Sequence, residues 1–153
     1  MALDIRIARP EDRTFIEALG KQTAMDSVPA GRTVDVREVL DNYIRLLEIV
    51  FGQSHVALVA HRSGVRVGFL LMLDAMPDEV TGNAQGFVAY MAVDPRHRNA
   101  GVGAALLERG EDEARKRRLP AMALMVTEDN APARTLYERA GFSTERRLLC
   151  KML

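Results

Sequence analysis

Apolar and polar side chains alternate at the start of the chain, and apolar side chains then gather in short runs separated by helical patterns. Leu3, Ile5 and Ile7 alternate with charged or small residues, which predicts a half-buried strand. Five further apolar runs predict strands over residues 55–60, 65–73, 87–93, 121–126 and 146–153. Apolar positions at helical spacing predict helices from about residue 10, from residue 35, over 101–117 and over 131–139.

These elements follow one another in the order β-α-α-β-β-β-α-β-α-β. Ser63 and Gly64 predict a tight turn between two strands, while residues 75–86 hold turn-forming residues and predict a loop. Hairpins joined to β-α-β units favour an α/β fold with a mixed, mostly antiparallel sheet flanked by helices. The length of 153 residues suits one domain, and no repeat or linker interrupts it, so we expect a single domain over residues 1–153.

The composition indicates a globular protein with no electrostatic preference for polyanions. The 21 basic and 21 acidic side chains cancel, so neither nucleic acid nor a membrane is an expected partner. The basic run 115–118 falls at a predicted helix end, where it would be solvated and would compensate the helix dipole. The first residues lack the apolar core of a signal peptide, and no run is long enough to span a bilayer. We therefore expect a soluble, cytoplasmic protein.

Metal and thiol chemistry find little support in the sequence. Cys150 is the only cysteine, which excludes an intramolecular disulfide and a cysteine-based metal cage. The histidines at 55, 61 and 97 show no metal-ligand spacing with neighbouring carboxylates. We expect no bound metal, and we expect Cys150 to be a small, buried apolar residue of the last strand.

The most informative stretch runs from the apolar strand at 87–93 into a helix that opens with Gly101-Val102-Gly103. The first backbone N–H groups of a helix lack intrahelical partners and lie at the positive end of the helix dipole. Glycines remove Cβ atoms, so an anion can approach such a backbone closely. Arg96 and Arg98 precede the helix, where guanidinium groups can contact phosphate oxygens. The pattern predicts an anion site that suits a pyrophosphate.

Several ligands and one purely structural explanation compete for this pattern. A P-loop requires Gly-Lys-Ser/Thr, but Ala104 follows the second glycine, so that motif is excluded. A dinucleotide site would need a third glycine where Leu106 stands, although Glu128 could imitate its ribose-binding acid. The two glycines could also serve only to let the helix pack tightly on a strand.

Two motifs resemble those of the GNAT superfamily of N-acetyltransferases. The acetyl-CoA-binding signature Arg/Gln-x-x-Gly-x-Gly/Ala is similar to Arg98-Asn99-Ala100-Gly101-Val102-Gly103. The second motif, Asn-x-x-Ala-x-x-Leu-Tyr-x-x-x-Gly-Phe, resembles Asn130-Ala-Pro-Ala133-Arg-Thr-Leu136-Tyr137-Glu-Arg-Ala-Gly141-Phe142. The predicted element order also matches this superfamily, so the resemblance covers essentially the whole chain. It implies a sheet in which two neighbouring strands splay apart.

The resemblance implies a role for each matching residue. Backbone groups of Met91 and Val93 would pair with the pantetheine amides, and Asn130 would bond the same arm. Backbone amides would receive the pyrophosphate, and these belong to Arg98, Asn99, Ala100, Gly101, Val102, Gly103 and Ala104. Ala133 and Arg134 would lie near the cofactor. Tyr137 would contact the cofactor and act as the catalytic acid that protonates the CoA thiolate, a role that suits a neutral phenol; a core tyrosine on an amphipathic helix is the alternative.

A general base is missing from the positions where many relatives carry a glutamate. Those positions read Phe87 and Met125 here, and neither side chain can take a proton. The nearest acids by sequence are Glu128, Asp129 and Asp26. We therefore expect an acceptor amine that arrives neutral or loses its proton through water.

The resemblance thus predicts an enzyme that moves an acetyl group from acetyl-CoA to a primary amine by direct attack. A small-molecule amine is favoured over a protein, and residues 26–34 and 143–146 would shape the acceptor site. Peptide, amino acid, polyamine and antibiotic acceptors all remain open. A non-catalytic acetyl-CoA sensor or interaction module is the alternative function. Dimers are common among relatives, so a homodimer is also open.

Overall fold

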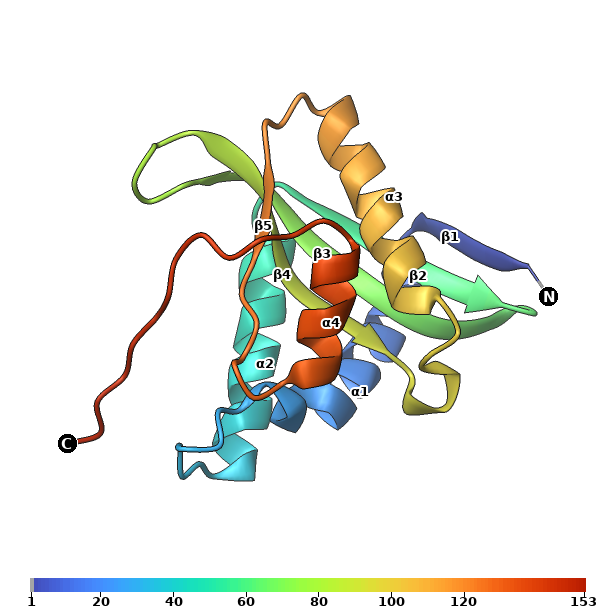
Figure 1. Ribbon diagram of the computed structural model, residues 1–153. Coiled ribbons are helices and arrows are strands. Elements are labelled where there is room, and N and C mark those ends of the chain that lie inside the picture. The colour runs from blue at the N-terminus through green and yellow to red at the C-terminus, as the bar shows by residue number, and fades with distance from the viewer. Residues whose placement is uncertain (1) are drawn as a thin grey trace.

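The structure is a computed structural model that describes residues 2–153, and its centre is one five-stranded sheet (Figure 1). The strands lie side by side in chain order: β1 (Leu3–Ile7), β2 (His55–Arg62), β3 (Val65–Pro77), β4 (Ala84–Val93) and β5 (Met122–Leu124). The first four pair antiparallel, and β4 pairs parallel with β5. The predicted mixed, mostly antiparallel sheet is therefore confirmed.

Four α-helices connect and cover these strands. They are α1 (Arg13–Thr23), α2 (Val36–Phe51), α3 (Val102–Lys116) and α4 (Ala131–Arg139). Short 3-10 turns are η1 (Pro10–Asp12), η2 (Ala24–Ser27) and η3 (Pro95–His97). Asp35 caps α2, because its carboxylate accepts from the backbone N–H of Arg37 at 2.8 Å. No helix within residues 2–153 is both long and apolar enough to cross a membrane.

The helices bury the two faces of the sheet separately. On one face, Ile16 of α1 and Leu47 of α2 pack with Phe69 of β3. On the other face, Leu106 of α3 packs with Leu70 of β3. Neighbouring residues of β3 thus point into different cores, which explains why this strand is continuously apolar rather than alternating.

Three predictions about strands need correction. The predicted loop over 75–86 is much shorter, because Met76 pairs with Gln85 and Pro77 with Ala84, so β3 and β4 run into it. The strand expected over 121–126 is limited to β5. The strand expected over 146–153 is wrong: residues 143–153 form no strand, and all of them are exposed.

The fate of the last segment also corrects the expectation for its cysteine. Cys150 is exposed rather than buried, because the strand that should carry it into the core does not form.

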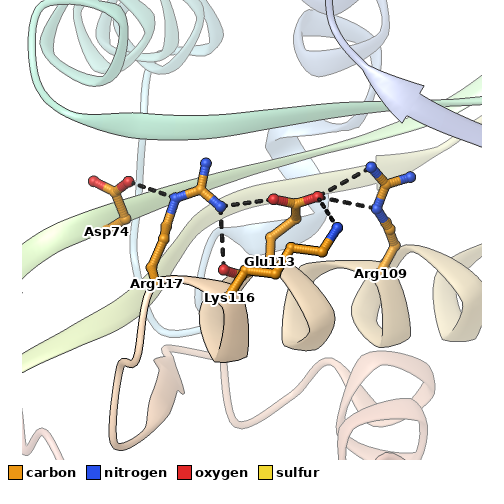
Figure 2. Close-up of polar contacts among 5 residues, drawn as sticks. All are labelled: Asp74, Arg109, Glu113, Lys116 and Arg117. Carbon is orange, nitrogen blue, oxygen red and sulfur yellow. Dashed lines mark hydrogen bonds and ion pairs between the residues drawn. The ribbon is translucent and has the colours of Figure 1, made fainter.

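A network of ion pairs around the buried Glu113 links the end of α3 to the sheet (Figure 2). Glu113, whose side chain is 7% exposed, bonds Arg117 at 2.6 Å, Arg109 at 3.0 Å and Lys116 at 3.3 Å. Arg117 also pairs with Asp74 of β3 at 3.0 Å. Hydrogen bonds from Arg117 above all, with those of Arg109 and Lys116, lower the pKa of Glu113 to about 2 against the opposing effect of burial. Part of the basic run 115–118 therefore stabilises the helix instead of only facing water.

Candidate active site

A gap opens between β4 and β5, the last two strands of the sheet. The two strands pair only where Gly86, Phe87 and Val88 lie beside Met122–Leu124. Beyond this point they separate around a cavity of about 80 Å³. Its lining residues come from η2, β4, β5 and α4, with one residue just past β5: Ser27, Val88, Ala89, Tyr90, Met91, Leu124, Met125 and Tyr137. We call this cavity the slot.

A β-bulge in β4 produces the separation. Leu71 of β3 pairs with Tyr90 and Met72 pairs with Val88, so Ala89 is left without a partner. Past the bulge, the backbone N–H of Asp94 donates to the carbonyl of Val67 at 2.8 Å.

The backbone N–H and C=O groups of successive residues point to opposite sides of a strand. The direction of Asp94 therefore determines the direction of Met91 and Val93, the two residues expected to bind the donor. If Asp94 faces β3, then Met91 and Val93 face away from it, into the gap. The structure therefore gives these two residues a free strand edge. Leu124 of β5 ends its own pairing at Val88, so no strand covers that edge.

The loop before α3 presents a row of free donors. Seven successive backbone N–H groups, those of residues 98–104, have no hydrogen-bond acceptor within residues 2–153. Asn99 (φ 59°) and Gly101 (φ 81°) adopt left-handed conformations that turn this backbone into the start of the helix. Arg62 donates to the carbonyl of Ala100 at 3.0 Å and holds the loop in place. Such a nest at a helix N-terminus suits a pyrophosphate.

The two glycines of the motif have different reasons to be glycine. A Cβ atom at Gly101 would meet nothing within 4 Å, and the residue is needed for its positive φ. A Cβ atom at Gly103 would lie 2.9 Å from Cδ2 of Leu136 on α4. The absence of a side chain at Gly103 thus lets α3 pack closely on another helix, α4, whereas the alternative for the motif was packing on a strand. The backbone N–H of Gly103 remains one of the free donors.

The two arginines of the loop are also unequal. Arg96 turns back and makes a two-point contact with Asp94, at 3.1 and 2.8 Å. This contact, together with the backbone N–H of Arg96, lowers the pKa of Asp94 to about 2. Arg98 instead reaches across to Asp26 of η2 at 3.2 Å. Both guanidinium groups are therefore paired, Arg96 by two short bonds and Arg98 by one longer contact, so Arg98 is the one more easily released to phosphate oxygens.

The second motif forms the start of α4, beside the slot. Asn130 caps the helix by accepting from the backbone N–H of Ala133 at 3.3 Å, which leaves its side-chain NH₂ without an acceptor in the described chain. Arg134 turns to Glu128 and pairs with it at 3.4 Å.

Tyr137 lies about two turns along α4 from Asn130 and lines the slot. Its ring packs edge-on against Phe142 with centroids 6.0 Å apart. Its hydroxyl has no hydrogen-bond partner among residues 2–153, and burial raises the pKa of the phenol. Tyr137 thus carries a proton at neutral pH that it can donate into the slot.

The slot holds residues that the motifs did not indicate. Tyr90 directly precedes the matched positions of β4. Its hydroxyl shares a hydrogen bond with Oγ1 of Thr23 at 2.9 Å and lies 3.3 Å from the carbonyl of Gly20. Its hydroxyl is therefore fixed, unlike that of Tyr137. Ser27 and Leu124 complete the wall, and only contacts across distant parts of the chain could reveal them.

Among residues 2–153, no carboxylate or imidazole lines the slot. Phe87 packs toward the core shared by α1 and α2, and Met125 lies exposed at the slot. The three candidate acids are engaged elsewhere: Asp26 with Arg98, Glu128 with Arg134, and Asp129 with the backbone N–H of Ala30 at 2.9 Å.

A larger cavity, of about 450 Å³, lies apart from both motifs between the end of β1, the start of β2 and the helices α1 and α2. Within residues 2–153, no three histidine, cysteine or acidic side chains gather as metal ligands would.

Three features of the site agree with the class of protein that the two motifs indicate, the acyl-CoA-dependent acyltransferases. They are the gap between β4 and β5, the free backbone N–H groups before α3, and the tyrosine hydroxyl without a partner. Residues 25–142 match the model of the Acetyltransferase (GNAT) family, and the chain belongs to this family. Members of the family use acetyl-CoA as the acetyl donor.

Individual relatives are more distant. Over 68 residues, 44% of this chain, the sequence is 38% identical to the mycothiol acetyltransferase of Beutenbergia cavernae, but the match spans only 22% of that protein. A putative acetyl transferase from Pyrococcus furiosus has a similar structure, with a TM-score of 0.84 at 23% identity over 99% of this chain and all of that one. The structure of AAC(6')-Iy with a bisubstrate analogue gives a TM-score of 0.75 at 20% identity, covering 100% and 99% of the two chains. At such identities the structural likeness establishes the fold alone.

Proposed function

We propose that residues 1–153 form one N-acetyltransferase domain that moves an acetyl group from acetyl-CoA to the primary amine of a small molecule. The main support for the proposal is the row of free backbone N–H groups at 98–104. This row follows the free edge of β4 after the short turn η3. A phosphate-bearing ligand that also has an amide-containing arm would satisfy both at once. The fit is that expected for acetyl-CoA.

Each part of the site has one task in donor binding. The backbone of Met91 and Val93 would pair with the pantetheine amides, while the loop amides and Arg98 would hold the pyrophosphate. The free NH₂ group of Asn130 would bond the pantetheine arm, with Ala133 and Arg134 beside it. Gly103 contributes through its backbone N–H only.

Acetyl-CoA supplies a thioester whose carbonyl carbon is open to attack by a neutral amine. The amine nitrogen forms a bond to that carbon, and the carbon–sulfur bond breaks. Tyr137 donates its proton to the departing sulfur, and the proton that the amine loses returns to the phenolate through water. The slot offers no side-chain base for the first step, so the amine itself must arrive deprotonated.

Two of the relatives support a small acceptor. The mycothiol acetyltransferase and AAC(6')-Iy, an aminoglycoside N-acetyltransferase, are named for small molecules, and they resemble this chain over part or nearly all of its length. Ser27 of η2 lines the slot, which supports residues 26–34 as part of the acceptor side. The identity of the acceptor and the cytoplasmic location stay predictions.

Thermal unfolding with acetyl-CoA, NAD and ATP tests donor binding. Acetyl-CoA at a hundredfold excess over its Kd should stabilise the protein by about 2.7 kcal/mol, whereas NAD and ATP should not. Ala104→Glu should abolish the shift, because it puts a carboxylate on an exposed position of the nest. Ala104→Gln, which has the same size without the charge, should keep most of it.

Release of CoA with a panel of amines then tests catalysis. Turnover with at least one small amine is expected. A clear acetyl-CoA shift without turnover on any amine or peptide would instead support a non-catalytic binding module. No shift at all in the unmodified protein would overturn the proposal.

A further inference from the structure

The larger cavity, of about 450 Å³, lies at the opposite edge of the sheet from the slot. Its walls come from residues 7–10 and 55–57, two side chains of α1, Phe51 of α2 and Arg117 after α3. The slot lies between β4 and β5, whereas β1 and β2 form the other edge of the sheet. The two cavities share no lining residue. We call the larger one the arginine cavity, and acetyl transfer as proposed above does not use it.

The inner wall of the arginine cavity is apolar. Ile16, Val56 and Ala57 line it, and their exposed fractions are 1%, 2% and 5%, so the cavity reaches down to the protein core. Phe51 is half-buried and packs against the same core. Ligand cavities commonly have volumes of roughly 300–1,000 Å³ and mostly apolar walls. The volume and the walls therefore suit the apolar body of a small molecule.

The charged side chains that line the arginine cavity are all cationic. They are Arg9, Arg13 and Arg117, and among residues 2–153 no carboxylate lines it. The fourth polar side chain, His55, directs Nδ1 to the carbonyl of Gln53 at 2.8 Å. An anion in this cavity would thus meet guanidinium groups without a competing acid in the wall.

Each of the three guanidinium groups has hydrogen-bonding capacity left over. The side chain of Arg9 has no hydrogen bond or ion pair within residues 2–153. Arg13 lies over the ring of Phe51, 4.2 Å from its centroid, and its contact with Glu17 at 3.4 Å is too poorly aligned for a hydrogen bond. Arg117 bonds through Nε and Nη1, while its remaining nitrogen has no acceptor in the described chain and points away from α3 (Figure 2).

The charge balance around the cavity favours one negative charge. Glu17 faces Arg13. Asp74 and Glu113 face Arg117. The charge of Arg9 has no such partner, so a ligand with a single negative charge would balance it. A carboxylate suits this place, because its two oxygens match the parallel N–H groups of a guanidinium.

We propose that the arginine cavity binds a small monocarboxylate that carries an apolar, ring-sized body. The body lies on the inner wall beside Phe51 and Val56. The carboxylate lies on the exposed side and accepts from Arg9 and from the free N–H groups of Arg13 and Arg117. This site is new to the chain and separate from the slot, and the inference stands independently of acetyl transfer.

Calorimetric titration with three related probes tests the chemistry of the ligand. Phenylpropanoate has both the ring and the charge, phenylpropanol has only the ring, and propanoate has only the charge. Phenylpropanoate should bind with one molecule per chain. Phenylpropanol should bind about 10- to 100-fold more weakly, because it loses the hydrogen bonds to a charged partner. Propanoate should bind more weakly still. Absence of binding by phenylpropanoate, or equal Kd values for the acid and the alcohol, would overturn the proposal.

Arg9→Gln tests the residue that has no counter-charge. The side chain is exposed and unpaired, so the variant should fold as the unmodified protein does. Its Kd for phenylpropanoate should rise by about tenfold, while that for phenylpropanol should not change. Arg37→Gln is the matched control, since Arg37 is also exposed but lies on the first turn of α2, about 21 Å along the helix from Phe51. Equal effects of the two substitutions would contradict a role for Arg9.

The methyl resonances of the protein locate the bound acid. The ring of phenylpropanoate should shift the methyl signals of Ile7, Ile16 and Val56, which line the arginine cavity. Signals of Val88 and Leu124, which line the slot, should stay in place. Saturation with CoA should leave the Kd for phenylpropanoate unchanged. Shifts confined to the slot, or competition by CoA, would place the acid in the slot and overturn the proposal.

Discussion

Arg98 and Asp26, which are 72 positions apart in the sequence, form an ion pair with 3.2 Å between Nη2 and Oδ2. Arg98 belongs to the loop that offers its amides before α3, and Asp26 belongs to η2 at the slot. Nε of Arg98 also lies 3.4 Å from the carbonyl of Val93, at the free edge of β4. The guanidinium therefore touches both regions that the proposed reaction must bring together.

Asp26→Asn should free Arg98 for the donor phosphates. Both side chains are about half exposed, and such a pair contributes about 0–1 kcal/mol, so the Kd for acetyl-CoA should fall by no more than about fivefold. Calorimetric titration measures this change. In an Arg98→Ala background the same Asp26→Asn substitution should have no effect, and an equal gain in both backgrounds would show that the pair is not the cause.

Tyr137→Phe should lower kcat by about 10- to 10⁴-fold, the span expected when a general acid is lost and water substitutes in part. The Kd for acetyl-CoA should change little, because only the hydroxyl is removed and the ring keeps its packing on Phe142. Tyr90→Phe is the control, since its hydroxyl already bonds Thr23 and Gly20. Equal losses in the two variants would assign Tyr137 to packing rather than proton donation.

The pH profile should reflect the acceptor rather than the enzyme. Burial raises the pKa of Tyr137, so the phenol stays protonated below its ordinary value near 10 and imposes no break near neutrality. A primary amine of pKa near 10 is about 0.1% neutral at pH 7, which costs about 4 kcal/mol, against about 1.4 kcal/mol for a pKa near 8. We expect kcat/KM to rise with pH until the amine titrates, and amines of low pKa to be preferred.

Profiles for two acceptors whose pKa values differ by about two units check this expectation. The break in kcat/KM should move with the acceptor. A break that stayed near pH 6–7 for both, and that disappeared in a single Asp or Glu variant, would reveal a side-chain base that the slot does not show.

Glu113→Gln should destabilise the protein at neutral pH and not in acid. The pKa of Glu113 is lowered to about 2 from an ordinary 4.5, so its contribution is complete above about pH 4.5 and is lost as the pH falls toward 2. The shift corresponds to at most about 3 kcal/mol. Urea unfolding at pH 7, 4 and 2.5 should show the two proteins converging. Glu111→Gln, which breaks an exposed pair with Arg115, should matter little at any pH.

Gly103→Ala should cancel the gain of about 1 kcal/mol that alanine brings to a helix, because the new methyl group would lie 2.9 Å from Cδ2 of Leu136 and push the end of that side chain aside. Leu136→Ala costs stability on its own, but combined with Gly103→Ala the loss should be smaller than the sum of the two. Thermal unfolding of the four proteins gives the coupling directly. Strictly additive losses would remove the packing explanation for this glycine.

The fold was largely predictable because its core elements have strong periodicity. The run 65–73 is apolar on both faces, as expected for a central strand that is covered by helices on both sides. Residues 146–153 misled the prediction for the same reason: they have the pattern of a strand, but in the structure they pair with no other strand. The hairpin between β3 and β4 was underestimated because Pro77 and Gly86 suggest a loop, although the two strands stay paired there through a shift of register.

The site was predictable where a motif acts through its backbone, and less so where side chains choose partners. Nothing local shows that the glycine at 103 is needed by Leu136, 33 positions away. The engagement of Arg98 by Asp26 is equally remote. The pairing of Arg96 with Asp94 is different, because an acid two positions before a basic residue at a proline turn is a local signal that could have been used.

The unpaired Ala89 means that β4 follows two hydrogen-bonding phases within one strand. Before it, even-numbered residues bond toward β5; after it, even-numbered residues bond toward β3. Deleting this one alanine would leave a strand of nearly the same length and composition, but with a single phase throughout. The backbones of β4 and β5 could then form hydrogen bonds along their whole shared length, and the gap between them would close. The gap between β4 and β5 thus depends on the number of residues in β4: one extra residue, Ala89, keeps it open, whatever its side chain.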